Sequence, residues 1–558
     1  MGELNSEMND ILEFLKSKEV KADRLLPAIT IFSAFKKALT TAKKESKEMS
    51  FAELKALLPT QEQKAVELLA KDKELKVVTS KAFLNRLANE YKEITAAYEG
   101  CLLQLVQNEG KNMQALAPEV LQLLEAIIEE YYPKRKDLKV YNPFAGFGSY
   151  LLSPQVKEYF AQDENDRAWA IGTLRLYLHG KETKNYHHED SILSWKGEDD
   201  YDLILSNFPF RILKEKEQLT AIEKMVGYAN RFRFDQSFLA MLAKAKSPSL
   251  TLHSSHVLYG KMSENETRKE IITNDLLDMV ILLPEMIHLD NMFATTFLLL
   301  NPKKKDKGVV RMIDGRSFVT PPGKKARLLT EDLVKAIKKK DKNFYREVKV
   351  EEIVEQNYNF DPERYIYETV ELPDFAESAR PLSGEDGLVD ILPLSKARRD
   401  DVYRISLARA TDDPFGERED PILLTKFRGP VYEVVPRDII LSFQNEKVLF
   451  AHYKIEGNIN EPSALMQFMK VLRLKEKVRI NREYLMLMLT TDYVLAQINR
   501  YKVGSDDRFT LSDADLARIK IPYCDIKSQR KLVDKLLDER EKAEKEARKR
   551  AKEEAKKK

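Results

Sequence analysis

A chain of 558 residues is too long for one hydrophobic core and predicts three or four domains of about 150 residues each. Its composition, 43% hydrophobic and 33% charged, is typical of a soluble globular protein, and its net charge of +3 gives no overall argument for nucleic-acid binding. Cys101 and Cys524 form no CxxC pattern, which argues against a disulfide framework or a zinc site. No basic-flanked apolar leader and no apolar run of about 20 residues is visible, so the expected location is the cytoplasm.

Residues 1–105 are predicted to form an N-terminal helical domain. Apolar side chains such as Leu54, Leu57 and Leu58 recur at helical spacing, and Lys and Glu fill the other positions. Nothing in this stretch has the pattern of a chemical site. The expected role is therefore a helical bundle that packs on its neighbours or on a partner.

Residues 106–366 alternate between predicted helices and predicted strands. The expected helices are 118–132, 167–179 and 238–246, and the expected strands are 139–141, 159–162, 202–206, 250–254, 279–283 and 296–301. Strands separated by helical stretches predict an α/β fold with a mostly parallel, doubly wound, Rossmann-like sheet. In such sheets ligands bind beyond the carboxyl ends of the strands.

The composition shifts near residue 373. Pro381, Gly384 and Gly387 mark a predicted linker over residues 367–388. Short β-like runs then predict a separate α/β or β-rich domain over 389–526. Residues 527–558 are predicted to form a charged C-terminal helix, either solvated or in contact with DNA or a partner.

The loop after the strand at 139–141 carries two glycines, in the sequence Asn-Pro-Phe-Ala-Gly-Phe-Gly over residues 142–148. Gly146 and Gly148 can adopt positive φ and leave no side chain between the backbone and a ligand. Asp163 ends the next strand, where a carboxylate can hold ribose hydroxyls, and Asp190 can accept a hydrogen bond from an adenine amine. Without a full GxGxxG pattern, the loop suits S-adenosylmethionine, which lacks a pyrophosphate; a plain strand-to-helix turn is the alternative.

The second motif is Ser206-Asn207-Phe208-Pro209-Phe210, directly after an apolar strand. The Asn207 amide oxygen and the Phe208 carbonyl can accept the two hydrogens of an exocyclic amine. Phe210 can stack on a base that has left the duplex. Attack on a methyl sulfonium needs alignment and electrostatics and no metal ion. Alone, the motif also fits a strand that ends in a proline turn.

In these motifs and their order the chain resembles the N6-adenine DNA methyltransferases, specifically the modification subunits of type I restriction systems. The family patterns D-P-x-C-G-T/S-G, Q-E-x-N, L-x-L-H-G and N-P-P-F/Y are matched by residues 142–148, 162–165, 176–180 and 207–210. Residues 266–284 and 357–366 also follow the family. The resemblance implies cofactor-binding residues Pro118, Asn142, Phe144, Gly146, Gly148, Asp163 and Asp190, catalytic residues Asn207, Phe208, Pro209 and Phe210, and no metal.

The C-terminal part resembles half of a type I specificity subunit, a target recognition domain followed by a spacer helix. The matching positions are Gly504-Ser505, Leu511, Asp515-Leu516, residues 519–522 and Gln529-Arg530. The resemblance implies a modification subunit fused to a target recognition domain. Its implied partners are double-stranded DNA, a second copy of the chain reading the other half-site, and a subunit of a restriction or defence system, with no membrane.

Three positions depart from the family pattern: Asn142 replaces an acid, Ala117-Pro118 replaces Thr-Pro, and Phe208 replaces a proline. Phe208 keeps the backbone carbonyl, whereas the first two departures bear on cofactor binding. The resulting prediction is a sequence-specific DNA methyltransferase that flips adenine out of the duplex and modifies its N6. The alternatives are a catalytically degenerate fold that serves in DNA binding or assembly, and a methyltransferase for RNA or protein.

Overall fold

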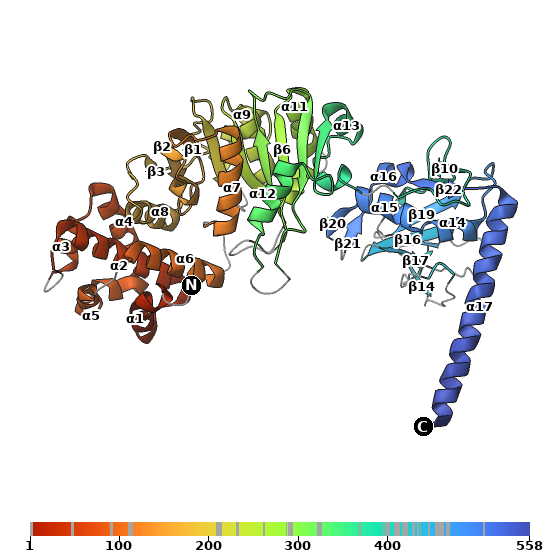
Figure 1. Cartoon of the computed structure of the whole chain (residues 1–558), viewed down its shortest axis with the longest axis horizontal. Helices are drawn as coiled ribbons and strands as arrows, with labels where there is room; N and C mark the ends of the chain where they lie inside the picture. The colour runs from red at the N-terminus through yellow and green to blue at the C-terminus, as the bar shows by residue number, and fades with distance from the viewer. Residues whose placement is uncertain are drawn as a thin grey trace. The chain divides into compact units, whose positions relative to one another are not determined.

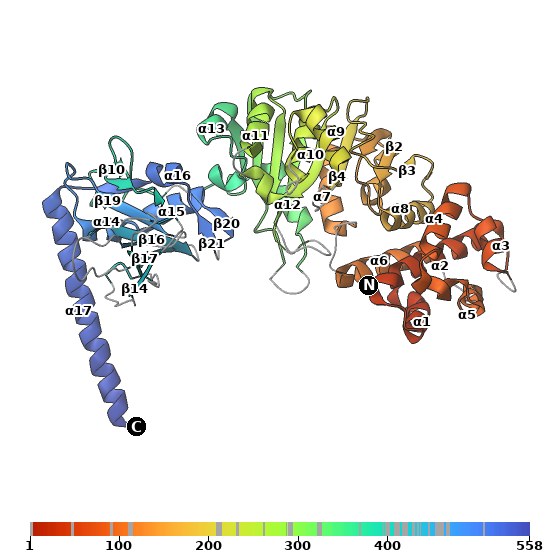
Figure 2. The same ribbon diagram turned by 180° about the vertical axis from the view of Figure 1, so that it is seen from behind.

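The chain divides into two compact units, Met1–Ile366 and Tyr367–Lys558. Figures 1 and 2 show them from opposite sides. The computed structural model describes residues 4–45, 49–89, 93–109, 115–207, 215–229, 234–259, 263–285, 287, 294–320, 326–367, 370–393, 395–396, 402–406, 413–415, 422–426, 430–431, 435, 437–444, 447–451, 463–464, 469–505 and 508–557.

The first unit is built on a nine-stranded sheet with the order β3-β2-β1-β4-β5-β7-β6-β8-β9. In that order the strands are Tyr186–His188, Val156–Asp163, Leu138–Asn142, Leu203–Asn207, Ser249–Ser254, Thr295–Leu300, Leu277–Leu282, Val309–Asp314 and Tyr345–Lys349. The five consecutive strands β3, β2, β1, β4 and β5 are parallel to one another, as are β6 and β8. Because β7 and β9 run antiparallel to their neighbours, the sheet is mixed, and the predicted α/β class is confirmed.

Both faces of the sheet are buried, which explains its nearly continuous apolar strands. Side chains alternate along a strand, so Leu203 and Leu205 of β4 join one hydrophobic core while Ile204 joins the other. Helices α7 (Pro118–Tyr131) and α12 (Thr330–Lys339) cover the face toward the viewer in Figure 1. The opposite face, turned forward in Figure 2, carries α9 (Lys216–Val226), α10 (Phe234–Ala243) and α11 (Ser263–Thr273).

The predicted helix at 238–246 is placed too late in the sequence. Helix α10 begins at Phe234, four residues earlier, and ends at Ala243. Its first turn contains Asp235 and Gln236, polar residues that interrupt the apolar pattern, yet both are buried. These polar residues made the start of the helix hard to predict from the sequence, but tertiary packing buries them within the helix.

The N-terminal helices pack on the sheet unit through α8 (Asp166–Leu178). They include α1 (Leu4–Ser17), α2 (Ala22–Ala42), α4 (Thr60–Ala70) and α6 (Ile94–Glu109). Their buried side chains and those on one face of the sheet form a single hydrophobic core. The helical character predicted for this stretch is confirmed, whereas the boundary at residue 105 stays a prediction.

Among its described residues, the second unit combines several small sheets with four helices. Its four-stranded sheet has the order β11-β19-β16-β17, with strands Val389–Ile391, Lys470–Leu474, Ile439–Gln444 and Lys447–Ala451. The helices are α14 (Arg482–Met488), α15 (Asp492–Tyr501), α16 (Asp513–Arg518) and the 32-residue α17 (Ile526–Lys557). Strand β10 (Ser378–Pro381), which falls within the predicted linker, pairs antiparallel with β22 (Lys520–Tyr523) near the end of the predicted recognition domain.

Candidate active site

Apart from Pro118, the predicted site residues that the structure describes lie at or just after the carboxyl ends of β1 to β4. These four strands are parallel neighbours, so the segments that follow them emerge side by side. Pro118, at the first position of α7, follows Ala117, the N-cap of that helix. The structure describes Asn142, Phe144, Gly146, Gly148, Asp163, Asp190 and Asn207, while Phe208, Pro209 and Phe210 lie outside the described residues.

Residues 143–149 after β1 form the glycine loop, and both glycines need their lack of a side chain. Gly146 has φ 54° and Gly148 has φ 70°, values in the left-handed region. The Gly146 amide donates to Oδ2 of Asp163 at 2.8 Å, and its carbonyl accepts from the Tyr186 hydroxyl at 2.6 Å. The loop is therefore held from β2 and β3, and its conformation depends on neighbouring strands.

Helix α8 approaches the glycine loop closely at Gly172. A Cβ at this position would lie 2.6 Å from the carbonyl oxygen of Gly146 and 2.7 Å from the Tyr186 ring. Real Cβ atoms do not reach such distances, so any larger residue would displace the loop or the ring. Gly172 lies outside the predicted glycine motif, and an isolated glycine in a helical stretch was the signal for it.

Both predicted carboxylates already hold the local backbone. Oδ1 of Asp163 accepts from the Asn165 amide at 2.9 Å, in addition to the bond from Gly146. Oδ1 of Asp190 accepts from the Ile192 amide at 2.8 Å, and its Oδ2 accepts from Nε2 of Gln218 at 2.7 Å. A carboxylate oxygen can accept more than one hydrogen bond, so binding the local backbone does not prevent a carboxylate from also binding a ligand.

Asn142, which stands where the family pattern has an acid, is fully buried at the end of β1. Its amide nitrogen and amide oxygen both lack a hydrogen-bond partner among the described residues. A buried unpaired amide costs roughly 1–3 kcal/mol, and such groups in native proteins call for an explanation. Phe144, two residues on, packs edge-to-face against Phe234 and Phe238 of α10.

Asn207, the last residue of β4, contacts the segment that follows the glycine loop. The Tyr150 hydroxyl donates a hydrogen bond to its amide oxygen Oδ1. Burial raises the pKa of Tyr150, so this hydroxyl stays protonated and remains a donor at neutral pH. The structure thus brings the predicted base-binding amide beside the predicted cofactor loop.

Sequence reasoning missed the residues that support this site. Tyr150 follows the quoted glycine motif by two residues, and Gln218 follows the second motif by eight, so neither belonged to a recognised pattern. Arg175 and Glu99 carried a usable signal, because each is a lone charge in an otherwise apolar stretch of its helix. Opposite charges in two such helices indicate a buried pair.

Across the described ranges of the chain, no group of three or more His, Cys, Asp or Glu side chains is arranged to hold a metal ion. Within the same ranges, no helix combines the length and apolarity that crossing a membrane requires.

Comparison with known proteins places these features in a family. The family model described as N-6 DNA Methylase matches residues 89–373. The MjaVII methylase subunit of a type I restriction enzyme from Methanocaldococcus jannaschii is 26% identical over 319 residues, covering 51% of this chain and 55% of that subunit. The MpnII methylase subunit from Mycoplasma pneumoniae is 24% identical over 312 residues, covering 48% of this chain and 56% of that subunit.

The chain spans about half the length of these two relatives. Among solved structures, the type IIG restriction endonuclease BpuSI aligns with a TM-score of 0.51 at 13% identity, covering 95% of this chain and 74% of that one. At this identity the likeness shows a shared fold and carries nothing about activity. The family match extends over the nine-stranded sheet, its covering helices and the glycine loop, and on this basis the chain belongs to the N-6 DNA methylase family.

Proposed function

We propose that the chain is a sequence-specific DNA methyltransferase that transfers a methyl group from S-adenosylmethionine to adenine N6 within a restriction-modification or related defence system. The observation that carries this proposal is the hydrogen bond between Tyr150 and Asn207. It joins the segment after the glycine loop to the residue that would hold the target base. A methyl donor on one loop and an amine on the other would then lie within reach of one another.

The residues around the glycine loop fit S-adenosylmethionine. Asn142 offers one amide donor group and one acceptor, both buried and unpaired among the described residues, which suits a zwitterionic amino-acid group. Gly146 and Gly148 leave the backbone open, and the carboxylates of Asp163 and Asp190 are acceptors suited to ribose hydroxyls and an adenine amine. Pro118 and Phe144 would complete the site. When bound, the cofactor supplies an electrophilic methyl group on a sulfonium.

Asn207 would act on the adenine amine. Its Oδ1 accepts from Tyr150, and an amide oxygen can accept more than one hydrogen bond, so we propose that the same oxygen also accepts a hydrogen from N6. We propose that the Phe208 carbonyl accepts the second amine hydrogen, and that Pro209 and Phe210 shape the pocket around a flipped base. Two acceptors on one amine draw the nitrogen lone pair out of conjugation with the ring and toward the methyl group.

The second unit would recognise the DNA sequence as a target recognition domain. Several positions of the specificity-subunit resemblance support this reading because they build its core: Leu511, Leu516, Ile519 and Ile521 are all buried. Gln529 is also buried and links α17 to the body of the unit, accepting from the Asn481 amide at 2.8 Å and donating to the Cys524 carbonyl at 2.8 Å. Double-stranded DNA, a second copy of the chain and a restriction or defence subunit would be the partners.

The test is methyl transfer from labelled S-adenosylmethionine to genomic DNA that lacks adenine methylation, which supplies all recognition sequences at once. The full chain should label this DNA, and Asn207→Ala should reduce the rate by about 100-fold or more. Calorimetry with S-adenosylhomocysteine should show that both proteins bind the cofactor. Cofactor binding without transfer would favour an RNA or protein substrate. Absence of both would favour a catalytically degenerate fold that serves in DNA binding or assembly.

The two-half-site arrangement has its own test. Sedimentation at micromolar concentration should give a dimer with duplex DNA present. A monomer with and without DNA would count against a second copy as partner while leaving the methyl-transfer reading intact.

A further inference from the structure

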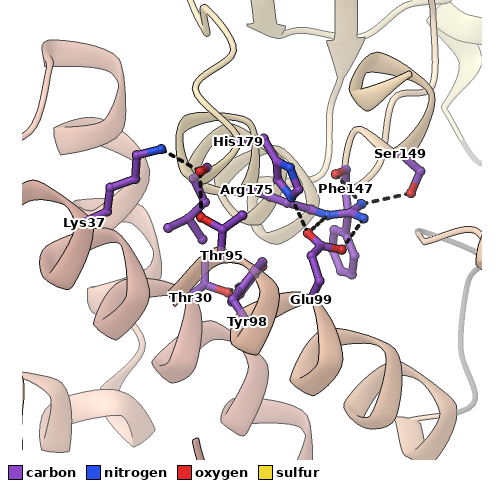
Figure 3. A network of polar contacts seen from close by, with 10 residues as sticks. Thr30, Lys37, Thr95, Tyr98, Glu99, Phe147, Ser149, Arg175 and His179 are labelled. Carbon is purple, nitrogen blue, oxygen red and sulfur yellow. Dashed lines mark hydrogen bonds and ion pairs between the residues drawn. The ribbon is translucent and has the colours of Figure 1, made fainter. Parts of the chain in front are cut away.

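We propose that Glu99 of α6 is a positioning residue for the glycine loop and acts on it through Arg175 of α8. The N-terminal helices would then form part of the cofactor site, with no cofactor contact of their own. This inference rests on the proposed function, because it assumes that the conformation of the glycine loop serves cofactor binding. Its geometry is drawn in Figure 3.

The pair is bidentate and largely buried. Nε of Arg175 donates to Oε1 of Glu99 and Nη2 donates to Oε2, both at 2.7 Å. Arg175 is only 5% exposed, and the Glu99 side chain is 21% exposed. His179, the C-cap of α8, places Nε2 2.9 Å from Oε1 of Glu99. The carboxylate thus fixes two groups of α8 from a different helix.

The free edge of the guanidinium faces the glycine loop. Nη1 of Arg175 donates to the Phe147 carbonyl at 3.1 Å and to Oγ of Ser149 at 2.9 Å. Phe147 lies between two glycines whose φ angles are positive, so few local side-chain constraints fix its carbonyl. The hydrogen bonds from Arg175 therefore set the direction of the loop backbone.

Ser149, which accepts from Arg175, also contacts the segment directly before α7, the helix that begins with the predicted cofactor residue Pro118. Oγ of Ser149 accepts from the Leu116 amide at 3.2 Å, directly before Ala117 and Pro118. One guanidinium thus connects α6, the glycine loop and the start of α7. The three parts are distant in sequence, and hydrogen bonds fix their relative orientation more directionally than apolar packing does.

Glu99 is needed to keep Arg175 in place, because the guanidinium of Arg175 is a buried charge that requires a charged partner. Burial acts to raise the pKa of Glu99, but Arg175 and the hydrogen bonds of His179 and Arg175 hold it at about 2, so the carboxylate is ionised at neutral pH. A buried charge that loses its partner is strongly unfavourable and turns toward water or another acceptor. Removing the charge at Glu99 would therefore draw Arg175 away from Phe147 and Ser149.

A merely structural role is the competing explanation, since other bonds also tie the N-terminal helices to α8. Thr95 of α6 donates to the Leu178 carbonyl at 2.9 Å, and Lys37 of α2 donates to the same carbonyl at 2.6 Å (Figure 3). Neither bond reaches the glycine loop. Thr95→Val is therefore a matched control: it removes one bond between the same two helices, with little change in side-chain volume.

The test compares Glu99→Gln with Thr95→Val in the full chain by two readouts. Amide hydrogen exchange should become faster in peptides that span residues 144–151 of Glu99→Gln, and affinity for S-adenosylhomocysteine should fall at least tenfold. Thr95→Val should change neither. Equal exchange and equal affinity in the two variants would overturn the proposal.

If Glu99→Gln is poorly folded, Ser149→Ala and His179→Gln keep the proposal testable. Ser149→Ala removes the acceptor on the loop and leaves the Glu99–Arg175 pair intact, and His179→Gln removes a contact of Glu99 that does not touch the loop. Ser149→Ala should weaken cofactor binding, His179→Gln should not, and equal affinities would overturn the proposal.

A folded Glu99→Gln adds a double-mutant cycle with Ser149→Ala. If Glu99 acts through Arg175, Glu99→Gln and Ser149→Ala should weaken cofactor binding non-additively. Additive effects would contradict the relay. If the wild-type chain binds no cofactor, the proposed function fails, and the exchange measurement still decides whether Glu99 orders the loop.

Discussion

The hydroxyl of Tyr150 donates a hydrogen bond to the amide oxygen of Asn207. Tyr150 is carried by the 3₁₀ turn Ser149–Leu152 that follows the glycine loop, and Asn207 ends β4. The glycine loop follows β1, a parallel neighbour of β4 in the sheet, so this bond joins the two halves of the site. It also fixes which atom of the Asn207 amide faces Tyr150, because only the oxygen can accept.

Replacing this tyrosine tests that orientation. Tyr150→Phe removes the donor and keeps the ring, so the Asn207 amide is no longer held with its oxygen in place. We expect kcat for methyl transfer to fall about fivefold, the cost of one neutral hydrogen bond of about 1 kcal/mol. The cofactor affinity measured by calorimetry should stay within twofold of wild type. A loss of cofactor affinity with unchanged kcat would place Tyr150 in the cofactor site instead.

A single methyl group on α8 should disturb the glycine loop. Gly172→Ala places a Cβ 2.6 Å from the Gly146 carbonyl, so the loop backbone or the Tyr186 ring must move. Overpacking of this kind costs roughly 1–3 kcal/mol. We expect a lower melting temperature and at least tenfold weaker binding of S-adenosylhomocysteine. Gly180→Ala is not a suitable control, because Gly180 has φ 70° and any side chain there strains the backbone. Ala170→Gly is the control, because it also changes side-chain size on α8 but adds no atom next to the glycine loop.

Asn142 should trade stability against binding. Its amide is buried with neither atom paired among the described residues, a cost that a cofactor would relieve. Leucine has a similar volume to asparagine and no polar side-chain atoms. The free energy of unfolding of ligand-free Asn142→Leu, measured by urea denaturation, should therefore exceed that of wild type by roughly 1 kcal/mol. Cofactor affinity should fall in the same variant. Lower stability together with unchanged affinity would mean that the Asn142 amide is satisfied within the protein.

The Glu99 carboxylate predicts a pH-dependent stability difference. Its pKa in the folded protein is about 2, below the ordinary value of 4.5, so its contribution is complete above about pH 5 and is lost as the pH falls toward 2. At about 1.4 kcal/mol per pKa unit, the charge would stabilise the fold by roughly 3 kcal/mol. Urea unfolding of wild type and Glu99→Gln should therefore differ most at pH 6 and converge toward pH 3. A difference that stays constant with pH would assign the effect to packing.

Much of the sheet could be predicted from the sequence because its signals are local. Apolar runs such as residues 202–206 mark strands that are buried on both faces, and the observed β4 is Leu203–Asn207. The order of motifs also placed Asn142, Asp163 and Asn207 at the ends of three parallel strands, where the structure has them. The reversal of β7 has no such signal, since an antiparallel strand within a buried sheet is as apolar as its neighbours.

The parts of the site that could not be predicted depend on contacts between distant segments. Gln218 reaches Asp190 across 28 residues, and Glu99 reaches Arg175 across 76. Neither spacing follows a helical or strand period, so no pattern within one element reports the contact. The roles of Phe208, Pro209 and Phe210 stay predictions, because they fall outside the described residues.

The most direct measurement of the central claim is the identity of the methylated nucleoside. Genomic DNA without adenine methylation is incubated with the full chain and S-adenosylmethionine, digested to nucleosides and examined by mass spectrometry, with Asn207→Ala in parallel. The proposed function predicts N6-methyl-2′-deoxyadenosine with the wild-type chain and at least about 100-fold less with the variant. Equal amounts from both proteins, or a methyl group on cytosine, would contradict the assignment of Asn207 as the residue that holds adenine.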